Sequence, residues 1–364
     1  MRDCQSRILC LSAGGCKGIL SASILEYINR VQPYRTDYSE TMGVSVGSII
    51  AWVVAQTNSV DDLKKQVNKC LTKLENHHTF LQKWTVLGSA INLFLSLLSH
   101  EHLYRKESLH NMLETFKLNS STLCKKLTVG IFCNDTGKYT EVDCETHSRN
   151  KIMKYIKASS SIQIFFAPTE IDGQKYSDGA IKHCIPINEI TKIVEHRSMS
   201  SHIDAIFCTP TTFDNFMGAI KDPCGTHLLK SVNNFAADVL WLVTENDIEE
   251  LHRLYPITRL RRDGYEILQG GTNNQHTITM ISPINVKYSG LEPSTCEIKN
   301  LRELGQHTGS NIHCICNKQS EQSFTVEKLL CDICKKPTEN GCQICFQATC
   351  SECTALQCFK ESTK

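Results

Sequence analysis

The sequence predicts an α/β fold in which a parallel-rich central sheet is flanked by helices. An apolar strand-like run, residues 8–11, is followed by a glycine loop and a helical stretch, and strand-like and helix-like segments then alternate along the chain. The 364 residues suffice for one large domain of this class and a small appendage. Strands are expected near 7–12, 126–133, 137–142, 203–208 and 277–282, and helices near 47–56, 60–75, 87–98, 106–117, 149–160 and 226–253.

The charge balance argues against a nucleic-acid binder. There are 39 basic and 38 acidic residues, which give a net charge of +1 and no strong electrostatic membrane anchor. No leading apolar region follows Met1, and no stretch reaches the roughly 18 to 20 apolar residues of a membrane span. We therefore expect an intracellular, cytoplasmic protein that binds membranes only peripherally.

A nucleophile-elbow pattern stands between the short run 41–42 and an apolar helical run. In Gly43-Val44-Ser45-Val46-Gly47 a serine lies between two glycines. A serine hydroxyl attacks carbonyl groups when it sits on a sharp exposed turn, where flanking side chains larger than hydrogen would clash. The pattern also occurs by chance in ordinary loops, so its context decides.

The glycine loop after the first strand supports two chemistries. Gly14, Gly15 and Gly18 precede a helix, and main-chain N–H groups at such a position bind phosphate or stabilise an oxyanion. A dinucleotide-binding loop would need glycine where Ala13 stands. It would also need an acidic residue at the end of a second strand, and residues 34–38 are a poor candidate for that strand. The loop therefore favours a hydrolase.

Two further segments give the sequence a family resemblance. Residues 158–168 read Ala-Ser-Ser-Ser and end in Phe-Ala-Pro, and Asp178-Gly179-Ala180 follows. Together with the glycine loop and the elbow, in this order, they make the chain similar to the patatin-like phospholipases over roughly residues 5–290. An isolated Asp-Gly would more often mark a hairpin turn.

The resemblance implies a catalytic dyad without histidine. Ser45 would be the nucleophile, Asp178 the general base, and the amides of Gly14 and Gly15 the oxyanion hole. It further implies a calcium-independent acyl hydrolase of the phospholipase A or lysophospholipase type, with no cofactor for catalysis. The substrate would be a phospholipid or another lipid ester at a membrane surface, so the protein would serve lipid degradation.

Several positions depart from the family pattern. If position 13 requires a positive φ, the methyl group of Ala13 would cost about 1 kcal/mol and misplace the oxyanion amides. The alternative is a catalytically inactive patatin-like body that carries a zinc-finger adaptor or ubiquitin-ligase-like module. The presence of both Ser45 and Asp178 favours the enzyme. None of the 14 histidines forms a triad motif with Ser45, and His183, which closely follows Asp178, is interpreted as a surface or core histidine.

The C-terminal part of the chain is rich in cysteine. Nine of the 20 cysteines lie between residue 314 and the C-terminus. Eight of them form pairs of metal-ligand spacing, which suit two structural zinc ions: Cys314, Cys316, Cys331, Cys334, Cys342, Cys345, Cys350 and Cys353. Disulfides are disfavoured without a secretory signal. We expect a hydrolase domain at 1–295, a linker at 296–310 and a zinc module at 311–364 that is structural or binds a protein partner.

Overall fold

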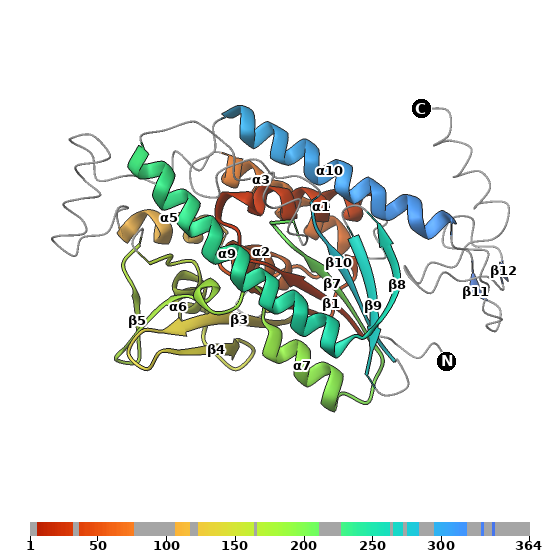
Figure 1. Cartoon of the computed structure of the whole chain (residues 1–364), viewed down its shortest axis with the longest axis horizontal. Coiled ribbons are helices and arrows are strands. Elements are labelled where there is room, and N and C mark those ends of the chain that lie inside the picture. Colours follow the sequence, from red (N-terminus) through yellow and green to blue (C-terminus); the bar gives the residue numbers. More distant parts are fainter. Residues whose placement is uncertain are drawn as a thin grey trace.

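Figure 1 shows the computed structural model of the chain. The structure describes residues 6–31, 36–75, 106–116, 123–163, 166–210, 227–262, 265–271, 275–283, 295–318, 329–330 and 337–338. The predicted helix at 87–98 lies outside these residues, as do Cys331, Cys334, Cys342, Cys345, Cys350 and Cys353.

A ten-stranded mixed sheet forms the centre of the molecule. Its five middle strands are mutually parallel, in the order β3 (Lys126–Cys133), β2 (Glu40–Val44), β1 (Ser6–Leu11), β7 (Ser201–Ile206) and β10 (His276–Ile281). Antiparallel strands extend both sides: β4 (Lys138–Asp143), β6 (Gln174–Asp178) and β5 (Thr169–Ile171) beyond β3, and β9 (Tyr265–Gly270) and β8 (Ile257–Arg262) beyond β10. The predicted α/β class is confirmed. A separate pair joins β11 (Leu329–Leu330) to β12 (Pro337–Thr338).

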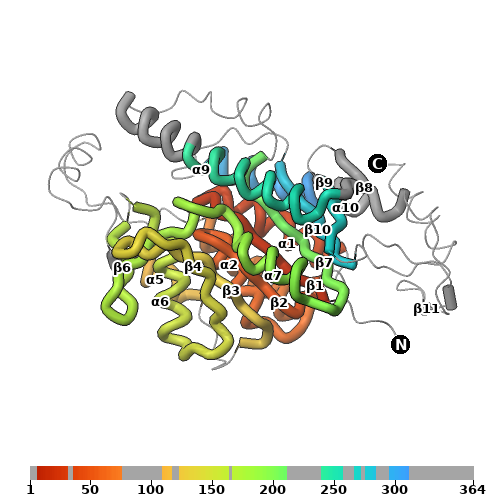
Figure 2. The backbone as a smooth tube through the Cα atoms, turned by 60° about the horizontal axis from the view of Figure 1, so that its bottom comes forward, coloured from red at the N-terminus to blue at the C-terminus, as the bar shows by residue number. Residues whose placement is uncertain are grey.

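Helices cover both faces of this sheet because its strands are apolar on both sides. In β1, Leu9 and Leu11 face one apolar cluster and Ile8 and Cys10 face the other. The first cluster, which we call the α2 face, is covered by α1 (Gly18–Val31), α2 (Val46–Ala55), α3 (Val60–Glu75), α5 (Lys106–Phe116), α6 (Arg149–Ser159) and α10 (Thr295–Lys318). The second, the α9 face, is covered by α7 (Ile187–His196) and α9 (His227–Leu254). Figure 2 shows the same arrangement from another side.

Helix α10 replaces the linker that the sequence analysis expected at 296–310. Ile298 and Leu301 are buried, and Leu304 packs against the same apolar cluster. A Cβ at Gly305 would lie 2.6 Å from the carbonyl oxygen of Leu20, so the two helix backbones nearly touch there. Apolar and small residues recur three and four apart in this segment, which is a helical pattern that the linker interpretation overlooked. The expected linker is therefore part of the main body.

The C-terminal end of α10 includes the first cysteine pair. Cys314 and Cys316 lie within its backbone range. Among the described residues, no group of three metal-ligating side chains comes together. Among the same residues, no helix is long and apolar enough to cross a bilayer.

Candidate active site

The register of the sheet brings the predicted nucleophile and base together. Ser45 directly follows Val44, the last residue of β2, and Val44 is paired with Gly130 of β3. The next residue of β3, Ile131, is paired with Asp178 at the end of β6. The antiparallel strand β6 therefore returns Asp178 to the edge of the sheet where the parallel strands end, which is where such sheets place their functional loops.

Ser45 occupies a strained turn between β2 and α2. Its φ of 57° and ψ of −131° lie in a region that non-glycine residues rarely adopt, at a cost of about 1–3 kcal/mol. A Cβ at Gly43 would lie 2.4 Å from the main chain of Gly47, and one at Gly47 would lie 2.3 Å from the carbonyl oxygen of Leu11. Both glycines of the predicted elbow are thus required by close main-chain contacts.

The serine run that ends α6 supports this turn. The side-chain oxygen of Ser159 accepts a hydrogen bond from the Ser45 N–H at 2.9 Å and donates one to the Gly130 carbonyl at 2.7 Å. The Ser160 hydroxyl donates to the Ser45 carbonyl at 3.3 Å, and the Ser161 carbonyl accepts from the Asp178 N–H at 3.0 Å. These three residues therefore hold the predicted nucleophile and the predicted base through one short segment.

Asp178 is a buried carboxyl with an open acceptor position. Its exposed fraction is 2%, and burial raises its pKa to about 7, although the nearby Ser45 hydroxyl and the hydrogen bond from the Ala180 N–H favour the charged form. Oδ1 accepts from the Ala180 N–H at 2.9 Å, where the short helix η4 (Gly179–Ile181) begins. The Ser45 hydroxyl is close enough to influence this pKa, yet within the described part of the chain Oδ2 has no partner at hydrogen-bond geometry. This oxygen can therefore accept a proton.

The glycine loop forms the short helix η1 (Gly15–Lys17) directly before α1. Ala13 does not have a positive φ, so the expected strain at this position does not arise. Within the described residues, the N–H groups of Gly14 and Gly15 donate to no other protein group, which leaves them open to an oxyanion. A Cβ at Gly18 would lie 2.3 Å from the Val46 side chain, so the loop packs directly beside the elbow.

Two residues that the motif analysis did not assign shape this loop. Cys208 follows β7 and lies close to Gly14. A Cβ added at Gly14 would be 2.3 Å from the Cβ of Cys208. Its N–H also donates to the Ser12 hydroxyl at 2.8 Å. Lys17 is only 8% exposed, and burial lowers its pKa to about 8, so its ammonium group stays mainly charged at neutral pH beside the loop. No local sequence pattern marks Cys208, because it contacts Ser12 and Gly14 only through the pairing of β7 with β1.

A model of the family described as patatin-like phospholipase matches residues 9–190, half of the chain. The chain belongs to the patatin-like phospholipase family. The matched span runs from β1 into α7 and contains both Ser45 and Asp178. The part of this patatin-like protein that carries β7 to β10, α9 and α10 lies beyond it.

Two solved structures are similar to this patatin-like chain. VipD from Legionella pneumophila has a TM-score of 0.41 and 12% identity, over 84% of this chain and 66% of that one. Human GIVD cytosolic phospholipase A2, in complex with methyl gamma-linolenyl fluorophosphonate, has a TM-score of 0.44 and 8% identity, over 86% and 58%. This chain thus spans less than two thirds of either protein. No curated protein sequence matches it.

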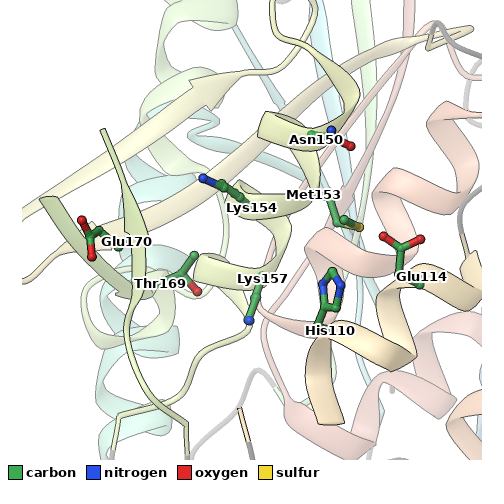
Figure 3. Close-up of a pocket in the computed structure, with 8 residues that line it drawn as sticks. All are labelled: His110, Glu114, Asn150, Met153, Lys154, Lys157, Thr169 and Glu170. Carbon is green, nitrogen blue, oxygen red and sulfur yellow. The ribbon is translucent and has the colours of Figure 1, made fainter. Parts of the chain in front are cut away.

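A cavity of about 500 Å³ lies between α5, α6 and β5. Figure 3 shows its lining, which includes His110 and Glu114 from α5 and Lys157 from α6. Neither Ser45 nor Asp178 lines it, so this cavity is separate from the catalytic pair.

We predict that Ser159→Ala weakens both stability and catalysis. The change leaves the Ser45 N–H and the Gly130 carbonyl without their buried partner, at about 1–3 kcal/mol for each unpaired group. Ester hydrolysis should fall at least about tenfold, since the nucleophile turn loses its support.

Ser161→Ala is the matched control for this experiment. It removes a hydroxyl that donates to the Lys157 carbonyl but keeps the Ser161 carbonyl that accepts from Asp178. Ser161→Ala should lower the free energy of unfolding by about 1 kcal/mol and leave turnover within about threefold of the wild type. Denaturant unfolding and initial rates are the measurements, and equal effects of the two substitutions would contradict the assigned role of Ser159.

Proposed function

We propose that this protein is a calcium-independent lipid acyl hydrolase, of the phospholipase A or lysophospholipase type, that uses a Ser45–Asp178 dyad. The observation that carries the proposal is the pairing of a strained, buried serine with a buried carboxyl whose Oδ2 is free to accept a proton. Membership of a phospholipase family supports the lipid substrate class.

In the proposed reaction, Asp178 acts first as base and then as acid. The Ser45 hydroxyl oxygen attacks the ester carbonyl as its proton passes to Oδ2 of Asp178. The Gly14 and Gly15 N–H groups stabilise the oxyanion of the tetrahedral intermediate. Protonated Asp178 then gives the proton to the leaving alcohol, and water, with Asp178 again as base, releases the fatty acid from the acyl-serine. No metal ion takes part in these steps.

We predict calcium-independent fatty acid release that requires Ser45. Wild-type protein with phospholipid vesicles and a calcium chelator should release fatty acid, and Ser45→Ala should lower the rate by at least about 10³-fold. The value of kcat/KM should rise with pH through about pH 7, because only ionised Asp178 can accept the serine proton and its pKa is about 7.

The control for fold integrity is the thermal midpoint of Ser45→Ala, which should match or exceed that of the wild type. No release from phospholipid, lysolipid or neutral glyceride by folded wild-type protein would overturn the proposal. Such a result would favour the inactive body with an adaptor module.

We further assign the membrane-facing side of the enzyme to η4 and α9. Among the described residues, the large apolar side chains that are exposed are Ile181, Met199 and Leu242. Ile181 follows the catalytic Asp178 in η4, and α9, which carries Leu242, packs against η4. Met199 instead precedes β7, at the amino ends of the parallel strands. A bilayer that meets the first two residues would lie next to the loop of the base.

We predict that Ile181→Ser and Leu242→Ser weaken binding to phospholipid vesicles, each by about three- to tenfold. Turnover of a monomeric, water-soluble ester by Leu242→Ser should stay within about twofold, because Leu242 belongs neither to the dyad nor to the loop that follows Asp178. Vesicle co-sedimentation and the two rates are the measurements. Met199→Ser is the matched control and should bind as the wild type does; a loss of binding as large as that of Leu242→Ser would contradict the orientation.

The C-terminal cysteine pairs form a zinc module in our proposal, on sequence spacing alone. We predict about two zinc ions per chain by inductively coupled plasma mass spectrometry. The double change Cys350→Ser and Cys353→Ser should lower the zinc content by about one ion per chain. Cys358→Ser, the control at the unpaired ninth cysteine, should leave it unchanged. A full-length protein without zinc, or equal losses in both variants, would contradict the proposed ligand set.

A further inference from the structure

We infer that Asp247 of α9 is a positioning residue. It fixes the loop that follows the general base, Asp178, and that contacts the oxyanion loop. The inference rests on the proposed function for its effect on rate. The loop in question, residues 179–186, follows Asp178 directly and is called the base loop below. Asp247 lies beyond residues 9–190, to which the family match is confined.

Asp247 is a buried carboxyl whose two oxygens are occupied by the base loop. Its side chain is 1% exposed. Oδ2 accepts hydrogen bonds from the N–H groups of Cys184 at 2.6 Å and Ile185 at 3.2 Å. Oδ1 lies 2.7 Å from Nδ1 of His183, which donates when the carboxyl is ionised. A buried carboxylate with three donors is stabilised rather than reactive, and it orders the groups that donate to it.

The same peptide group reaches the oxyanion loop. The carbonyl oxygen of Cys184 accepts a hydrogen bond from the Ala13 N–H at 2.8 Å. Ala13 immediately precedes Gly14 and Gly15, whose amides are assigned to the oxyanion hole. The Cys184 carbonyl and the Ile185 N–H belong to one peptide group, so Asp247 and Ala13 bind its two sides. Asp247 therefore holds this peptide group, and the peptide group holds the loop that must keep the two glycine amides in place.

The other end of the base loop is tied to Asp178. The N–H groups of Lys182 and His183 both donate to the Gly179 carbonyl, at 3.0 Å and 3.1 Å, and Gly179 adjoins the base. The His183 ring also packs edge-on against Tyr139, with 4.8 Å between ring centres. The base loop is thus held by Tyr139 of β4 on one side and by Asp247 of α9 on the other.

Asp247 acts at a distance from the chemistry. Its helix packs on the α9 face of the sheet, whereas α2, which begins after Ser45, packs on the α2 face. Within the described residues, neither His183 nor Asp247 forms a hydrogen bond with Ser45 or Asp178. The His183–Asp247 pair is therefore no hidden triad, and its contribution runs through the main chain of the base loop.

The test compares Asp247→Ala and Asp247→Asn with wild type in the full chain. Alanine removes all three acceptor contacts, whereas asparagine keeps an oxygen for the Cys184 and Ile185 N–H groups. We expect kcat, normalised to the Ser45 fraction that reacts with a fluorophosphonate, to fall about 100-fold for alanine and about tenfold for asparagine, with KM within about threefold. Glu250→Gln is the matched control on the same helix, because Glu250 pairs with Arg253 at the surface and with no other group among the described residues, and it should leave both constants unchanged.

Hydrogen exchange supplies a measurement that does not depend on activity. In Asp247→Ala, the amides of residues 180–185 and the hydrogen-bonded amides of residues 13, 17 and 18 should exchange at least about tenfold faster, while those of α3 stay unchanged. If wild-type protein proves inactive, the proposed function fails and exchange alone still tests the positioning role. Unchanged exchange in both loops, or an unchanged normalised kcat in an active enzyme, would overturn the inference. If the alanine variant does not fold, the asparagine variant decides by the same two criteria.

Discussion

The close approach of α2 to the end of β1 is the contact on which the rest of the site depends. A Cβ at Gly47 would lie 2.3 Å from the Leu11 carbonyl oxygen, so the helix can begin there only with glycine. This contact forces the chain to turn sharply at Ser45, with a φ of 57°. Such a turn persists only if surrounding structure fixes it, and Ser159 and Ser160 do so from α6.

Asp178 and Asp247, two of the buried aspartates, show how hydrogen-bond number separates a structural carboxyl from a proposed base. Asp247 has three donors, whereas Asp178 has the Ala180 N–H on Oδ1 and an open Oδ2. Burial raises the pKa of Asp178 from 3.8 to about 7, so its neutral form is the one the fold favours. The stability that this provides is complete below about pH 4 and is lost as pH rises through about 7. The ionised base that the reaction needs is thus obtained at the expense of stability.

Short local motifs explain what could be predicted from the sequence. The Ser45 elbow and the Gly14-Gly15 loop each encode a turn, and most central strands and helices follow from apolar periodicity. Strand order and register are not local, so the contacts of Cys208 and Asp247 with the site had no signal in the sequence. The linker was placed before the cysteine-rich segment on composition alone, whereas residues 295–318 form α10 and Gly305 allows this helix to pack on α1.

The site draws on both helical layers because it lies at the edge where the two faces of the sheet meet. The proposed nucleophile, Ser45, belongs to the α2 face, since the adjacent Val46 joins that cluster, while Cys184 and Ile185 of the base loop join the α9 face. Ala13 lies on the α9 face as well, and its N–H contact with Cys184 links oxyanion loop and base loop there. Neither layer alone fixes all three elements of the proposed site: the Ser45 turn, the base loop and the oxyanion loop. In our inference, the segment beyond the family match places residues that lie within it, through Asp247 of α9.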